Sequence, residues 1–144
     1  MDVSLLALAH LAFTLAMVGL MTAVQLVIYP AFRRVPQANF VDYVNAHGVA
    51  ITRPLALFAP AEVVLALLVW IAASGGAAVV AFLSGALLAI AWIATMVFYG
   101  PFHGRLTSEP YNPAMIERLI TTNWARTTIW WLRGIIAIWL VTQI

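Results

Sequence analysis

The sequence predicts an all-α membrane protein, a polytopic bundle of four transmembrane helices with a short interfacial helix in the first cytoplasmic loop. Of its 144 residues, 65% are hydrophobic and 8% are charged, and the mean hydropathy is +1.01. Soluble domains are instead about 45–50% apolar and about 25% charged. Four apolar segments each reach the roughly 20 residues that a helix needs to cross a bilayer. The arginines of the connecting loops all fall on one side of these segments.

The four segments cover about residues 3–29, 54–73, 77–99 and 116–142. We interpret them as one membrane domain over residues 1–144. Pro30 and Pro101 are expected to end the first and third helices, because proline donates no backbone hydrogen bond. Asn112 and Pro113 are expected to form the N-cap and first position of the fourth helix.

The first loop and the start of the second helix carry signals of their own. Residues 36–47 combine an apolar and a polar face, as in a short amphipathic helix that lies at the membrane interface and covers a pocket opening there. Gly48 is expected to end this short helix. Thr52 is expected to cap the second transmembrane helix, with Pro54 in its first turn. Pro60 lies further along that helix, where we expect a kink.

Arginine sets the expected orientation. The first loop contains Arg33, Arg34 and Arg53, and the third contains Arg105 and Arg118. By the positive-inside rule, both long loops face the cytoplasm and both termini face outward. We expect this arrangement in a bacterial inner membrane. The net charge of +2 is small and dispersed, which argues against a nucleic-acid partner. The lipid bilayer is the expected partner, and a homo-oligomer stays open.

Glu62 and Arg126 are the sharpest functional signals, because ionisable residues at membrane depth are costly and functional by default. Counted from the expected cytoplasmic helix ends at about 1.5 Å per residue, Glu62 lies about 12 Å deep and Arg126 about 14 Å deep. We therefore predict that the two pair within the cytoplasmic half of the bundle. A purely structural ion pair is the competing interpretation.

A polar pocket is expected around this pair. Arg126 and Arg133 are seven residues apart and share nearly one helix face, which must turn inward because two arginines cannot face lipid. Polar residues of the first and third helices lie at similar depth. The predicted binding residues are Gln25, Tyr29, Tyr99, His103, Asn123, Trp130 and Arg133. An apolar cavity with a few converging polar groups is typical of a small-molecule site.

The histidines add a candidate base. His47 and His103 lie near the cytoplasmic loops, and His47 is a candidate general base near neutral pH. The predicted catalytic set is therefore His47, Glu62 and Arg126. No His-x-x-x-His or Glu-x-x-His spacing occurs, so neither a metal nor another cofactor is expected. Haem between His47 and His103 is disfavoured because no helical histidine pair faces across the bundle, although a haem or metal recruited from a second chain stays open.

Several motifs are spread along nearly the whole chain. They are Tyr29-Pro30-Ala31-Phe32, the Phe40–Tyr43–His47 segment, Pro60-Ala61-Glu62, and Asn123-Trp124-Ala125-Arg126-Thr127 followed by Trp130 and Arg133. Together they resemble the anthrone-oxygenase-like family of small four-helix membrane proteins. Some members of that family oxidise polyketide anthrones to anthraquinones with molecular oxygen, without metal or flavin. The resemblance implies a cofactor-independent monooxygenase, an oxidoreductase acting on a lipophilic anthrone- or quinone-like aromatic molecule.

Such chemistry needs a base, a cation that stabilises a phenolate, and a dry aromatic pocket. The resemblance implies His47 or Glu62 as the base, Arg126 as the cation, and Trp130 with Tyr29 as aromatic walls. Two alternatives stay open. One is non-enzymatic binding or transport of a small lipophilic or anionic molecule, although no inverted repeat supports transport. The other is a structural membrane subunit in which the charged pair serves assembly alone.

Overall fold

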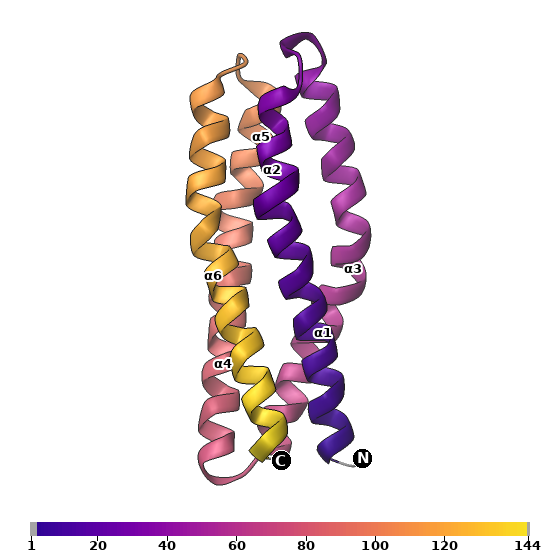
Figure 1. The fold of residues 1–144 in the computed structure, drawn as a ribbon, viewed down its shortest axis with the longest axis vertical. Helices are drawn as coiled ribbons and strands as arrows, with labels where there is room; N and C mark the ends of the chain where they lie inside the picture. Colours follow the sequence, from indigo (N-terminus) through magenta and orange to yellow (C-terminus); the bar gives the residue numbers. More distant parts are fainter. Residues whose placement is uncertain (1–2, 144) are drawn as a thin grey trace.

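The computed structural model describes residues 3–143, which form one elongated bundle of helices running along a common axis (Figure 1). Three continuous helical stretches are long and apolar enough to cross a membrane, namely Val3–Arg34, Gln37–Ala72 and Gly75–Ser108. This indicates an integral membrane protein. A fourth long helix, α6, spans Pro113–Gln143. The all-α class is confirmed over the described residues.

The first and third stretches each change helix type partway. The first contains α1 (Val3–Ala23), the π-helix η1 (Val24–Ile28), α2 (Tyr29–Ala31) and the 3-10 turn η2 (Phe32–Arg34). The third contains α4 (Gly75–Ala94), the π-helix η4 (Thr95–Tyr99) and α5 (Gly100–Ser108). Each π-helix therefore lies directly before a proline-containing turn, with Pro30 in α2 and Pro101 in α5.

The expectation that Pro30 and Pro101 end their helices is wrong. The amide of Tyr29 bonds the carbonyl of Val24, and the amide of Gly100 bonds that of Thr95, five residues back in each case. Local π turns of this kind accommodate the carbonyls that a proline leaves without a donor, and membrane helices tolerate proline for this reason. Both helices consequently continue past the proline toward the loops.

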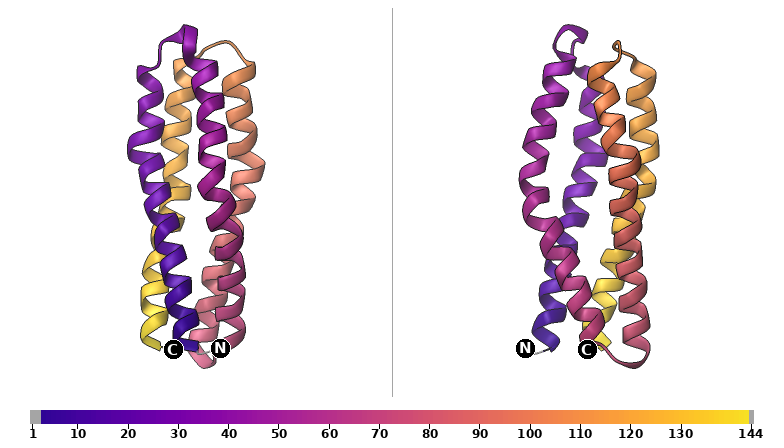
Figure 2. Two further views of the ribbon diagram at one scale, coloured as in Figure 1. Left: turned by 90° about the vertical axis from the view of Figure 1, so that its right-hand side faces the viewer. Right: turned by 180° about the vertical axis from the view of Figure 1, so that it is seen from behind.

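The second stretch also differs from expectation. After the short turn η3 (Gln37–Asn39), α3 runs unbroken from Phe40 to Ala72. The expected interfacial helix over 36–47 is therefore not separate, since most of it forms the first turns of α3. Gly48 does not end a helix, and Thr52 is no N-cap, because its hydroxyl donates to the Gly48 carbonyl at 2.8 Å. α3 bends in its middle part, as two interior prolines would require (Figure 2).

The four long helical stretches pack as a square. α1 contacts α3 and α6, and α4 contacts the same two helices, so α3 and α6 lie diagonally across the bundle. The loops before α3 and before α6 lie at one end, whereas the α3–α4 turn lies at the other end with both chain termini (Figures 1 and 2). That turn uses Gly75 with φ of +55°, a conformation that favours glycine because it has no Cβ.

Apolar and polar side chains are distributed as lipid requires. Large apolar residues such as Leu26, Ile71 and Phe98 are 54%, 68% and 68% exposed on the outer surface. The buried polar and charged residues are His10, Thr14, Gln25, Glu62, Ser84, Asn123, Arg126, Thr127 and Arg133. This arrangement places the costly groups inside the bundle and leaves an apolar surface for the acyl chains.

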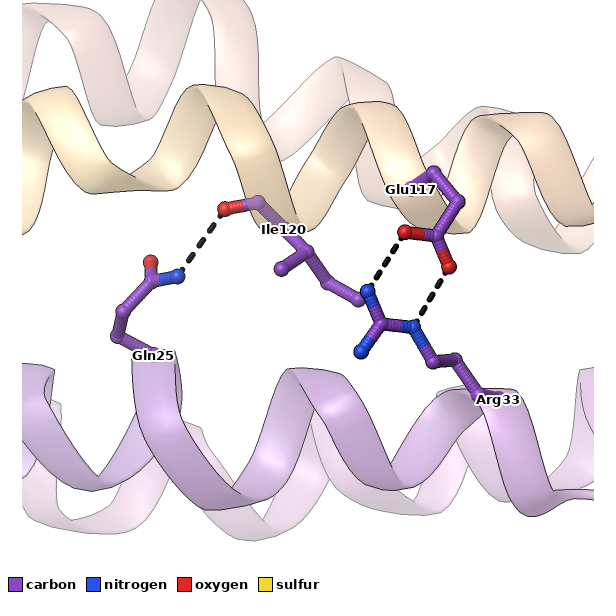
Figure 3. Close-up of polar contacts among 4 residues, drawn as sticks. All are labelled: Gln25, Arg33, Glu117 and Ile120. Carbon is purple, nitrogen blue, oxygen red and sulfur yellow. Dashed lines mark hydrogen bonds and ion pairs between the residues drawn. The ribbon is translucent and has the colours of Figure 1, made fainter.

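Hydrogen bonds fix α1 and its continuation against α6 (Figure 3). Gln25 donates through Nε2 to the Ile120 carbonyl at 3.1 Å, and Arg33 makes two 2.6 Å contacts with the carboxylate of Glu117. At the start of α6, the Oδ1 atom of Asn112 accepts from the amide of Ala114 at 2.9 Å. This confirms Asn112 as the N-cap, with Pro113 as the first helical residue.

Candidate functional site

A cavity of about 420 Å³ lies in the half of the bundle that carries the long loops. Its walls come from the end of α1 with η1 and α2, from the first half of α3, from η4 and α5, and from α6. The polar lining residues are Tyr29, Asn45, His47, Thr95, Tyr99, His103, Thr107 and Arg126, and the apolar ones include Met21, Val24, Ile51 and Leu55. Its size and lining match a small-molecule site.

Arg126 supplies the positive charge of this cavity. The residue is 7% exposed, and its guanidinium lies 4.3 Å above the centre of the Tyr99 ring. Its Nη atoms donate to the Thr95 and Tyr29 hydroxyls, each at 3.3 Å, and its Nε atom has no partner within the described chain. No carboxylate pairs with Arg126 among residues 3–143, so its charge is available to an anionic group of a ligand.

Tyr29 and His103 form a directed hydrogen-bond chain that ends at Arg126. The Nδ1 atom of His103 lies 2.7 Å from the Tyr99 carbonyl oxygen, which can only accept, so Nδ1 carries the proton. In the neutral ring Nε2 is then an acceptor. Nε2 lies 3.1 Å from the Tyr29 hydroxyl, which therefore donates to His103 while accepting from Arg126. The hydroxyl is thus held in one orientation at the cavity wall.

His47 differs from His103 because its ring is not engaged by hydrogen bonds within residues 3–143. Its ring centre lies 5.4 Å from that of Phe32, 6.3 Å from that of Tyr29 and 6.4 Å from that of His103. An imidazole with both nitrogens uncommitted can take a proton from a ligand. His47 is therefore the free base of this cavity, whereas His103 is committed to orienting Tyr29.

The two π-helices explain why the two tyrosines meet. Tyr29 follows η1 directly, and Tyr99 is the last residue of η4. Each π turn inserts an extra residue into its helix and changes the direction of the side chains that follow. The Tyr99 hydroxyl donates to the Thr122 carbonyl of α6 at 2.8 Å, which fixes its ring beneath Arg126. The segments that directly precede Pro30 and Pro101 thus build two walls of one cavity.

The cavity opens between α3 and α5. Its exposed lining residues are Asn45 and Val49 on α3 and Gly100 and Gly104 on α5. A Cβ added to Gly48 or to Gly104 would meet nothing within 4 Å. Glycines therefore border the mouth, and a Cβ at either of these two positions would clash with no neighbouring atom.

Glu62 pairs with Arg133, and the predicted Glu62–Arg126 pair is wrong. Both side chains of the observed pair are 0% exposed. Arg133 also donates through Nε to the Ser84 carbonyl at 3.1 Å, and its guanidinium lies 5.0 Å from the centre of the Trp130 ring. Glu62 does not line the cavity, so it is not placed to act there as a base.

Helix ends explain this correction. The expected depth of Glu62 was counted from Pro54, but α3 begins at Phe40. Counted from the opposite end, Glu62 is ten residues before Ala72 and Arg133 is ten residues before Gln143, about 15 Å each at 1.5 Å per residue. Arg126 is seven residues further from that end. Glu62 and Arg133 therefore lie at the same level of the bundle and meet across its diagonal, from α3 to α6.

Three further predicted binding residues also lie outside the cavity lining. Gln25 accepts through Oε1 from Asn123 Nδ2 at 2.7 Å, so the two amides join α6 to η1. Trp130 is 2% exposed in an apolar cluster and lies edge-on to Trp92. Of the ten predicted site residues, the structure brings together Tyr29, His47, Tyr99, His103 and Arg126. It places Gln25, Glu62, Asn123, Trp130 and Arg133 elsewhere in the interior.

The predicted set omitted Thr95 and the glycines of the cavity. Thr95 binds Arg126, and Gly48, Gly100 and Gly104 line the wall. A signal for them exists in the Tyr-Pro and Tyr-Gly-Pro sequences, because proline inside an apolar run favours a local change of helix type. Within residues 3–143, no three histidine, aspartate or glutamate side chains group as metal ligands would.

Comparisons of the chain with protein families, with characterised proteins and with solved structures found no match. The resemblance to anthrone-oxygenase-like proteins therefore stays a prediction.

Proposed function

We propose that the cavity binds a flat, lipophilic and weakly acidic aromatic molecule and that the protein oxidises it with molecular oxygen. One observation carries the proposal. An unpaired arginine and an uncommitted histidine, Arg126 and His47, line the same largely apolar cavity. A cation in a site of low dielectric stabilises a phenolate or enolate, and a nearby imidazole can accept the proton that creates it.

The proposed reaction is that of an anthrone, as the sequence resemblance implies. His47 takes the acidic ring proton, and the guanidinium of Arg126 stabilises the resulting oxyanion. The electron-rich anion passes one electron to O₂, and the two radicals combine into a peroxide that accepts a proton. The peroxide then loses water to leave the quinone. The sum is anthrone plus O₂ giving anthraquinone plus H₂O, so substrate and oxygen supply all the electrons.

The residues beneath the cavity favour this proposal over transport. Between the cavity and the Glu62–Arg133 pair lie Met17, Leu88, Ala91 and Trp130, which belong to one apolar cluster. A transported anion would have to cross this layer without polar partners, at a high cost in free energy. A site closed on its far side instead suits a molecule that enters and leaves through one mouth.

Oxygen uptake with anthrone tests the proposed activity. The purified protein in lipid nanodiscs should consume one O₂ per anthraquinone formed, above the rate in empty nanodiscs. His47→Phe keeps an aromatic ring but removes the base, and should lower the rate by about 10²–10⁴-fold. Arg126→Gln should lower it by about 10²–10³-fold. Arg34→Gln, at an exposed site, is the matched control and should change nothing.

Equal oxygen uptake by wild type, His47→Phe and Arg126→Gln would contradict catalysis in this cavity. Circular dichroism of each variant should match wild type, which separates loss of function from loss of fold.

We further propose that α6 is a fourth transmembrane helix and that the loop-bearing end faces the cytoplasm. Two observations support the fourth span, and the arginines of the two long loops support the orientation. The charged side chains Arg126 and Arg133 are 7% and 0% exposed, and α6 contacts both α1 and α4. The chain contains no cysteine, so single cysteines can be labelled without background. In intact cells an impermeant maleimide should label Ser74→Cys but not Ser108→Cys, and the reverse result would invert the orientation.

A further inference from the structure

A second cavity lies between the η4–α5 segment and α6, and Tyr99 separates it from the first cavity. Its volume is about 390 Å³, and the Tyr99 side chain lines both cavities. The remaining lining separates into an apolar group that includes Val97, Phe98 and Phe102, and a cationic pair, Arg105 and Arg118. None of these five residues lines the first cavity.

The two arginines leave positive charge in this second cavity. Arg105 already holds Glu109, with contacts of 2.6 and 3.4 Å. Arg118 lines the cavity from an exposed position on α6. Its guanidinium has no hydrogen-bond or ion-pair partner among residues 3–143. Two guanidinium groups with one carboxylate give the site one uncompensated charge, so an anion is the ligand that the electrostatics favour.

The lining of the second cavity changes from apolar to charged along the axis of the bundle. Val97 and Phe98 are 57% and 68% exposed and lie toward the middle of the bundle. Arg105 follows Val97 by eight residues, about 12 Å closer to the loop end at 1.5 Å per residue. Arg118 is near the start of α6, at the same loop end (Figure 1). The cavity thus has a cationic end near the loops and an apolar end toward the middle of the bundle.

We infer that the second cavity binds an anionic phospholipid, with its phosphate at Arg105 and Arg118 and an acyl chain along Val97 and Phe98. A soluble anion would leave the exposed apolar wall without a partner. A lipid without net charge would leave the positive charge of Arg118 uncompensated. Basic clefts at the cytoplasmic ends of membrane helices bind anionic headgroups in this manner. Because Tyr99 forms a wall of both cavities, the bound lipid also packs behind the ring that supports Arg126.

Native mass spectrometry with defined lipids tests this inference. Phosphatidylglycerol and phosphatidylcholine with identical acyl chains are titrated against the full chain in micelles. Wild type should bind phosphatidylglycerol about fivefold more tightly, since one surface arginine contributes about that factor. Arg118→Gln should abolish the preference, and Arg118→Lys should retain most of it. Arg53→Gln removes an exposed arginine outside this cavity and should leave the preference unchanged.

Three outcomes would overturn the inference. They are equal affinity of wild type for the two lipids, an unchanged preference in Arg118→Gln, and an equal loss in Arg53→Gln. A separate competition distinguishes a lipid from a soluble anion. Inorganic phosphate at the lipid concentration should displace no phosphatidylglycerol, and full displacement would assign the site to a soluble anion instead. Neither readout depends on oxygenase activity, so this inference and the proposed function can fail separately.

Discussion

Removing one partner of the buried Glu62–Arg133 pair should destabilise the bundle strongly. Glu62→Gln removes the negative charge that compensates the guanidinium of Arg133, which is 0% exposed and otherwise contacts the Ser84 carbonyl and the face of Trp130. An uncompensated buried charge of this kind costs about 3–5 kcal/mol, which is roughly 10²–10⁴-fold in the unfolding equilibrium. Arg133→Met should cost a similar amount, because it strands the Glu62 carboxylate.

The double variant Glu62→Gln/Arg133→Met removes both charges and should be more stable than either single variant. Reversible unfolding by sodium dodecyl sulfate in mixed micelles, followed by circular dichroism, measures all four free energies of the double-mutant cycle. Glu117→Gln is the control, since its pair with Arg33 is about half exposed and should contribute nothing resolvable. A Glu62→Gln protein as stable as wild type, or strictly additive single variants, would refute the reasoning.

Three further changes have defined outcomes. Gly104→Leu should narrow the cavity mouth and weaken anthrone binding at least tenfold in a titration, whereas Gly85→Leu, another helical glycine with open space at its Cβ, should bind as wild type does. Gln25→Leu leaves the Asn123 amino group without its 2.7 Å partner and should lower the unfolding free energy by about 1–3 kcal/mol. An unchanged unfolding free energy would show that this hydrogen bond does not stabilise the bundle. Gly134→Ala brings a Cβ to 3.1 Å from a methyl group of α1 and should lower the melting temperature measurably, and an unchanged value would show that the contact yields freely.

The sequence predicted the helices well because their signal is additive over many residues. Apolar segments near 3–29, 77–99 and 116–142 each correspond to a long helix, and the Asn112–Pro113 start of α6 is confirmed. Helix ends were predicted less well. A proline inside a helix of a soluble protein usually ends or kinks it. In this bundle a π turn accommodates Pro30 and another accommodates Pro101. The local rule for proline therefore gave the wrong boundaries.

The charged pairing was missed for a related reason. Depth along a helix is a reliable guide only when the helix start is known, and the early start of α3 at Phe40 shifts the level at which Glu62 should be matched. Residue type alone pointed to Glu62, Arg126 and Arg133 as interior groups, and all three are buried. Which arginine meets the glutamate depends on helix register, which one sequence does not specify.

The cavity residues were predictable only in part. Tyr29, Tyr99, His103, His47 and Arg126 stood out because polar groups at similar depth were expected to converge, and the structure places all five in one lining. The separate role of Gln25 and Asn123 depends on side-chain geometry, since each could face the cavity or its neighbour. Their mutual hydrogen bond ties the Gln25 Oε1 atom to the Asn123 amino group, and neither residue lines the cavity.

The central claim is that Arg126 offers its charge to an oxyanion of a flat aromatic ligand. The most direct test is the absorption spectrum of 1,8-dihydroxyanthraquinone bound to the protein in nanodiscs, recorded as a function of pH. An adjacent guanidinium should lower the apparent pKa of the bound phenol by about one to three pH units relative to empty nanodiscs, and Arg126→Gln should abolish this change. An identical titration curve in wild type, in Arg126→Gln and in empty nanodiscs would contradict the claim.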